Sequence, residues 1–106
     1  MGIAMMTKRP IVHELGLNDH DLELAGRFAS FVNRRIFVWG SRVKGYYEDS
    51  SDYDISVSGT RHDFPRIKLL AAAFAKNEGI KIDIGLFAED PQIYGQFVNP
   101  VMSGIS

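Results

Sequence analysis

Apolar and polar residues follow two different periods along this chain, and each period predicts a different kind of element. Four consecutive apolar residues at 36–39 are typical of a short buried strand. Residues 80–86 alternate strictly between apolar and polar positions, which predicts a strand with one buried face. A third strand is predicted at 52–57, where aromatic and aliphatic residues alternate with polar ones. We therefore expect three strands of one sheet.

Two further stretches carry apolar residues at helical spacing. The first predicted helix begins at Asn18 or Asp19, either of which can cap it, and ends near position 33. The second predicted helix covers 64–76, with Asp63 as its cap. The expected core-facing residues are Leu22, Ala25, Phe28, Ala29 and Val32 in the first helix, and Phe64, Ile67, Leu70, Ala71, Phe74 and Ala75 in the second.

The order helix, strand, strand, helix, strand predicts an α/β (α+β) fold, with a small mixed β-sheet and helices packed on one face. The 106 residues correspond to the size of one domain, so we assign residues 1–106 to a single domain. We also expect a short helix over 11–15, a turn at Asp90–Pro91 and a last short helix or strand over 93–98.

Composition narrows the function classes. Net charge is −1, which argues against a broad basic surface for nucleic acid. There is no cysteine, so disulfides and thiolate metal sites are excluded. No apolar run reaches signal-peptide length near the start or membrane-spanning length anywhere, so we expect a cytoplasmic protein without membrane contact. Self-association into a homo-oligomer is compatible with this composition.

The predicted strand at 52–57 carries the first candidate chemistry. Because side chains alternate between the two faces of a strand, Asp52, Asp54 and Ser56 share one face. Two carboxylates about 7 Å apart on one face are costly unless a positive charge lies between them. A divalent cation such as Mg²⁺ is the obvious candidate. On the strand at 80–86, Asp83 lies on the polar face and can join the same site if both strands share a sheet.

These residues carry a resemblance. Gly40–Ser41, ten intervening residues, Asp52 and Asp54, and a later Asp83 on a strand look like the nucleotidyltransferase superfamily that includes DNA polymerase beta. The resemblance implies a nucleotidyltransferase fold over roughly residues 20–90.

A finer pattern is similar to the minimal nucleotidyltransferases that often pair with HEPN-domain proteins. That pattern is Gly-Ser-x-Ala-Arg-Gly, five residues, then Ser-Asp-x-Asp, and Gly45 and Ser51 also match it. The chain departs from the pattern at Val43, where alanine is usual, and at Lys44, where arginine is usual. A lysine supplies a point charge but not the bidentate fork of an arginine, so this departure bears on phosphate affinity.

The resemblance implies transfer of a nucleoside monophosphate, with ATP as the expected donor, Mg²⁺ as the cofactor and a hydroxyl on a HEPN-domain partner as the acceptor. The protein would then be the antitoxin of a toxin–antitoxin pair. The residues expected to bind the nucleotide are Gly40, Ser41, Arg42 and Lys44, and those expected to hold metal and carry catalysis are Asp52, Asp54 and Asp83.

Each assignment has a simpler alternative. Asp52 and Asp54 can belong to a solvated turn, and Asp83 can be an ordinary exposed strand residue. Arg42 and Lys44 can be plain surface charges. At the level of function, the same chemistry can act on RNA or on a small molecule, although the near-neutral charge weighs against RNA. A degenerate member that binds a nucleotide or a partner without turnover is the non-enzymatic alternative. Trp39 is expected in the core, with base stacking as the alternative.

Overall fold

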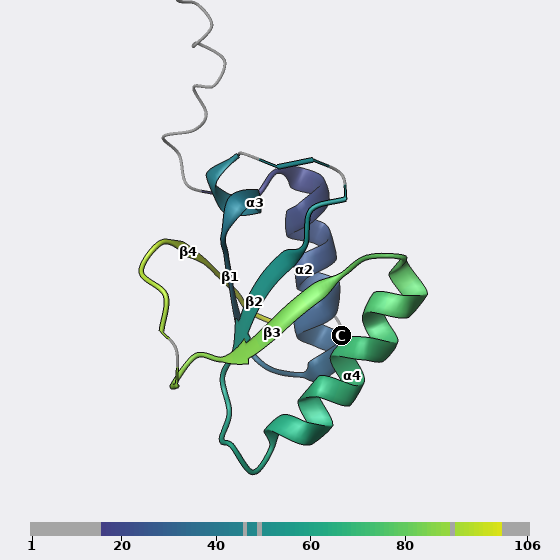
Figure 1. The fold of residues 1–106 in the computed structure, drawn as a ribbon, viewed down its shortest axis with the longest axis vertical. Helices are drawn as coiled ribbons and strands as arrows, with labels where there is room; N and C mark the ends of the chain where they lie inside the picture. Colours follow the sequence, from purple (N-terminus) through teal and green to yellow (C-terminus); the bar gives the residue numbers. More distant parts are fainter. Residues whose placement is uncertain (1–15, 46, 49, 90, 101–106) are drawn as a thin grey trace, which may run out of the picture.

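The computed structural model describes residues 16–45, 47–48, 50–89 and 91–100. The helix predicted over 11–15 and position 90 of the predicted turn lie outside these residues. Figure 1 shows the elements in chain order: α2 (Asp19–Val32), β1 (Ile36–Trp39), α3 (Ser41–Lys44), β2 (Tyr53–Val57), α4 (Phe64–Glu78), β3 (Ile82–Leu86) and β4 (Gly95–Val98).

The four strands form one mixed sheet in the order β3-β2-β1-β4. β1 pairs antiparallel with both β2 and β4, whereas β2 and β3 run parallel. A parallel pair needs a crossover connection, and α4 supplies it between β2 and β3. The prediction of a small mixed α/β domain is confirmed.

One face of the sheet is apolar because of the period-two pattern. Ile36 and Val38 of β1, and Tyr53, Ile55 and Val57 of β2, are almost completely buried. Residues of α2 and α4 pack in the same core cluster, as do the partly buried isoleucines of β3. Both long helices therefore cover this face of the sheet, and neither covers the opposite face.

Two of the helix ends agree with their sequence signals, whereas Asp63 precedes α4 as predicted but its side chain makes no capping hydrogen bond. The Asn18 side chain accepts a hydrogen bond from the backbone N–H of Asp21 and caps α2. Gly79 ends α4 in a left-handed conformation, at φ 73°. One core assignment was wrong: Leu22 is 39% exposed, and Leu24 is buried in its place. In the second helix, Ile67, Ala71 and Phe74 are buried as expected.

The segment after β3 returns to the sheet. Of the two alternatives for 93–98, the strand is observed, and β4 pairs along β1. The residues before β4 connect the far edge strand β3 to the opposite edge, beside β1 (Figure 1). Among the described helices, none combines the length and the apolar composition needed to cross a bilayer.

Candidate functional site

The parallel pairing of β2 and β3 brings two aspartates together. Asp54 and Asp83 are register partners, each in the second position of its strand. The neighbours of Asp83 on β3, Ile82 and Ile84, pack against the core. By alternation, Asp54 and Asp83 therefore lie on the face that the helices leave uncovered. This geometry agrees with the prediction that Asp83 and Asp54 lie on the same face of the sheet.

Asp52 lies one residue before β2 and is exposed. It completes a group of three acids drawn from two neighbouring strands. The group stands at the end of the sheet where β1 leads into α3, because Asp54 is also the register partner of Trp39. The turn at Gly40–Ser41 thus lies directly beside Asp54.

Gly40 and Asp54 fit together closely. A Cβ added to Gly40 would fall on the Oδ2 atom of Asp54 and would lie 3.0 Å from its Cγ. Gly40 also has φ 86°, a conformation that other residues rarely adopt. Glycine is therefore required at position 40 for two reasons: its backbone conformation, and the lack of space for a Cβ beside the Asp54 carboxylate.

The charge of Asp54 is unfavourable in this setting. Burial, followed by the neighbouring charges of Asp83 and Asp52, raises the pKa of Asp54 above its ordinary value. Within the described part of the chain, no basic side chain forms an ion pair with any of the three acids. A cation bound from solution would relieve this repulsion.

The donor chemistry suits Mg²⁺, although the three acids do not form a closed cage. In the residues that the structure describes, no three acidic or histidine side chains are grouped closely enough to hold a metal by themselves. Mg²⁺ in nucleotide sites is usually held by one or two carboxylates together with waters and substrate phosphates. Asp54 with Asp83 or Asp52 meets that requirement.

Two of the predicted phosphate-binding residues remain near the acids. Ser41 is the first residue of α3 and is partly buried, and Lys44 is exposed at the other end of this short helix. Both come from the turn that follows β1. Their contact with a nucleotide stays a prediction.

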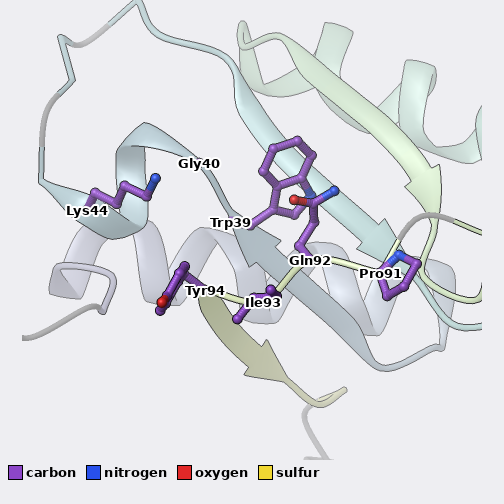
Figure 2. A pocket seen from close by; sticks show the side chains of 7 residues that line it. All are labelled: Trp39, Gly40, Lys44, Pro91, Gln92, Ile93 and Tyr94. Atoms are coloured by element: carbon purple, nitrogen blue, oxygen red, sulfur yellow. The ribbon is translucent and has the colours of Figure 1, made fainter.

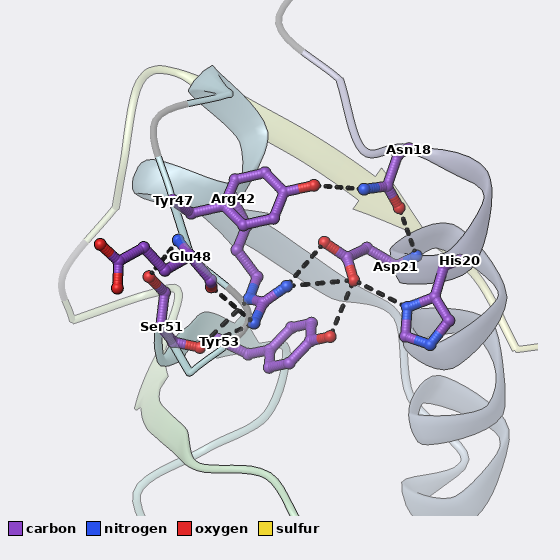
Figure 3. Close-up of polar contacts among 8 residues, drawn as sticks. All are labelled: Asn18, His20, Asp21, Arg42, Tyr47, Glu48, Ser51 and Tyr53. Carbon is purple, nitrogen blue, oxygen red and sulfur yellow. Dashed lines mark hydrogen bonds and ion pairs between the residues drawn. The ribbon is translucent and has the colours of Figure 1, made fainter.

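The alternative that Arg42 is a plain surface charge was wrong, whereas the contact of its backbone N–H with a phosphate stays a prediction. Arg42 neither projects towards the acids nor lies on the surface: it is 5% exposed and pairs with the equally buried Asp21. Its Nη1 donates to both carboxylate oxygens of Asp21, at 3.2 and 3.0 Å. Figure 3 shows this contact together with those of the residues around it. The guanidinium is thus part of the interior.

Further contacts tie Arg42 to the segment that leads into β2. Its Nη2 and Nε donate to the carbonyl oxygen of Ser51, at 2.9 and 3.2 Å (Figure 3). Its guanidinium carbon lies 3.9 Å from the ring centroid of Tyr53, whose hydroxyl donates to Asp21 at 2.8 Å. Burial and the hydrogen bond to Asp21 raise the pKa of Tyr53. We call Asp21, Arg42 and Tyr53 the buried ion-pair network.

The buried ion-pair network fixes the relative position of the two halves of the site. Arg42 belongs to the turn after β1, and Ser51 and Tyr53 flank Asp52. A signal for this arrangement was present in the sequence. Asp21 lies four and seven residues before Ala25 and Phe28, and so falls on the buried stripe of α2. A charged residue on such a stripe needs a buried partner.

A pocket of about 320 Å³ includes Gly40, the residue that packs against Asp54 (Figure 2). One side is formed by Trp39, Gly40 and Lys44, and the other by residues 91–94. Trp39 is partly buried, and its indole N–H donates to the Ser56 hydroxyl at 3.2 Å. No local pattern indicated this pocket, because its two sides are about fifty residues apart along the chain.

Comparison with known proteins gave no match, so any functional assignment depends on the geometry of the site. No protein-family model, no curated protein and no solved structure matched this chain.

Proposed function

We propose that this protein is a metal-dependent nucleotidyltransferase with the superfamily's fold, and that it transfers a nucleoside monophosphate from a nucleoside triphosphate to an acceptor hydroxyl. The observation that supports the proposal most strongly is the pairing of Asp54 with Asp83 beside Gly40, on the uncovered face of the sheet. Acids without basic partners, next to a glycine turn, suit a metal-bound polyphosphate.

Asp54 would hold Mg²⁺ together with Asp52 or Asp83. When bound, Mg²⁺ would neutralise the negative charge of the polyphosphate and that of the departing pyrophosphate. The repulsion between neighbouring carboxylates that raises the pKa of Asp54 would also favour binding of Mg²⁺, because a bound cation relieves that repulsion. Gly40 would let the phosphates approach the backbone, and Ser41 and Lys44 would donate hydrogen bonds to them.

In the transfer step, the oxygen of the acceptor hydroxyl forms a bond to the α-phosphorus, and the bond from that phosphorus to the pyrophosphate oxygen breaks. The proton of the acceptor would pass to a carboxylate, and we assign this role to Asp83, which is exposed. Pyrophosphate leaves with the bonding electron pair. The chain thus contributes mainly positioning and charge.

The resemblance extends the proposal to the donor and the acceptor. ATP would be the donor, and the acceptor would be a hydroxyl side chain on a HEPN-domain partner, which makes this chain the antitoxin of such a pair.

The first test is nucleotide binding, which needs no knowledge of the acceptor. Calorimetry with ATP should give saturable binding in millimolar Mg²⁺ and little binding with EDTA. Asp54→Asn should weaken Mg²⁺-dependent binding at least tenfold, and Glu23→Gln, an exposed acid on α2, should leave it unchanged. Equal binding with and without Mg²⁺ would contradict the metal assignment.

The second test is label transfer. The protein is incubated with Mg²⁺ and α-labelled ATP, with an extract of a heterologous cell or a purified HEPN-domain protein as the source of acceptor. We expect covalent label that depends on the added protein and is lost in Asp54→Asn and Asp83→Asn. Binding of ATP without transfer to either source would favour the degenerate alternative, and undiminished transfer by Asp54→Asn would refute the site.

A further inference from the structure

Trp39, Gly40, Lys44 and residues 91–94 form a pocket (Figure 2), and its residue Gly40 also packs against Asp54. We propose that this pocket holds the aromatic base of the donor nucleotide. The proposal rests on the proposed function, and it adds the part of the substrate that the acids and the glycine turn do not contact.

Two residues join the pocket to the acids. Trp39 is one wall of the pocket and is also the register partner of Asp54 on the neighbouring strand. Gly40 lines the pocket, and its missing side chain leaves room for the Asp54 carboxylate. A triphosphate held at the acids would therefore place its nucleoside within reach of the pocket.

The walls have the chemistry that a base requires. Trp39 and Tyr94 are the two aromatic residues of the lining, and Pro91 and Ile93 add apolar surface (Figure 2). Every nucleobase has a π-face, so stacking on aromatic side chains is a general way to hold one. The bond from the Trp39 indole to Ser56 fixes the orientation of that ring before any ligand arrives.

The charge and size of the pocket favour the donor over an apolar acceptor. Lys44 brings a positive charge to the same wall as Gly40, which suits a ligand that carries phosphates. The volume of about 320 Å³ lies at the lower end of the range for small-molecule sites, which is the size class of a nucleoside. Tyr94 is 60% exposed, so the pocket opens to solvent and can admit a ligand without unfolding.

The chain carries its own reporter for this proposal, because Trp39 is its one tryptophan. Titration with Mg²⁺ and ATP should change the tryptophan emission saturably. Mg²⁺ with inorganic tripolyphosphate, which has no base, should displace ATP in competition but should not reproduce the change. An identical response to tripolyphosphate would overturn the proposal, because the base would then make no contact with the indole.

The matched variants are Tyr94→Ala and Tyr94→Phe. The side chain is largely exposed, so neither change should unfold the protein. Tyr94→Ala should weaken binding of Mg²⁺–ATP by about tenfold, within the range for loss of one stacking ring, and should leave Mg²⁺–tripolyphosphate binding unchanged. Tyr94→Phe should bind both ligands like the original chain. Calorimetry, which does not depend on Trp39 emission, measures all four affinities.

The outcomes separate the two proposals. Label transfer with an unchanged KM for ATP in Tyr94→Ala would leave the proposed function intact and overturn the base pocket. A weakened transfer to the acceptor with unchanged ATP affinity would place the acceptor, not the base, in the pocket and would also overturn it. Conversely, saturable quenching by adenosine in a protein that transfers no label would support the pocket while the proposed function fails.

Discussion

Asp54 and Asp83 lie side by side on neighbouring parallel strands, on the face of the sheet that neither long helix covers. Asp54 is also packed against Gly40, and its charged form is disfavoured by burial and by the two nearby acids. An arrangement that costs stability is expected at a site selected for binding, where repulsion between ligand groups is relieved by the bound cation.

The first prediction concerns stability and pH. Because the folded-state pKa of Asp54 is raised, its contribution to stability is fully present below the unfolded pKa and is lost as pH rises through the folded pKa. Asp54→Asn should therefore raise the melting temperature at pH 7, and the gain should shrink as pH falls to about 4. Thermal melts of both proteins from pH 4 to 8 measure this. A gain that is constant with pH would show that the charge of Asp54 is not its cause, and Glu23→Gln provides the baseline.

The second prediction concerns metal. A ligand that binds only the folded state stabilises it by mass action, by about 2.7 kcal/mol at one hundred times its Kd. Mg²⁺ together with a non-hydrolysable ATP analogue should therefore raise the melting temperature of the original protein by several degrees, and EDTA should abolish the rise. In Asp54→Asn, the same ligands should raise the melting temperature only slightly. A rise of equal size in Asp54→Asn would place the metal elsewhere.

The third prediction separates two roles of a glycine. Gly40 and Gly45 have nearly the same positive φ, 86° and 89°, but a Cβ at Gly45 would meet no atom within 4 Å. Gly45→Ala should lose about 1–2 kcal/mol of stability from its left-handed backbone. Gly40→Ala should lose more, because Gly40 has ψ −159°, a backbone conformation that is essentially restricted to glycine. Only Gly40→Ala should also lose Mg²⁺–ATP binding, because its Cβ displaces the Asp54 carboxylate. Parallel chemical denaturation and calorimetry compare the two, and equal losses of binding would refute the contact.

The fourth prediction concerns the buried ion-pair network. Asp21→Asn leaves the Arg42 guanidinium buried without its counter-charge, which should cost about 3–5 kcal/mol in the free energy of unfolding. Tyr53→Phe removes only one hydrogen bond to Asp21 and should cost about 1 kcal/mol. Urea denaturation measures both. Asp19→Asn, an exposed change two residues earlier in α2, should stay within about 1 kcal/mol.

The position of Arg42 shows where sequence reasoning failed. The sequence offered two positions for the Arg42 side chain, at a phosphate or on the surface, yet this side chain turns inward to Asp21 on α2. The two residues are 21 positions apart, and no local period relates them. The helical spacing of Asp21 with Ala25 and Phe28 was the available signal, but a pattern on one element does not name its partner on another.

The sequence alone determined the elements and their faces. A period of two in the strands and a helical period in α2 and α4 divide each element into an apolar and a polar side, and burial of the apolar side is the main driving force for folding. It also predicted that Asp54 lies on the polar face of its strand, whereas Asp52, predicted on the same strand, lies one residue before it.

Only the tertiary structure decided what those faces meet. Parallel pairing in a single register sets Asp83 against Asp54, and a shift of one residue would have sent it to the other face. The inward turn of Arg42 and the approach of residues 91–94 to Trp39 were likewise decided by contacts distant in sequence. Such contacts depend on the joint packing of several elements, and the pattern within any one of them does not contain that information.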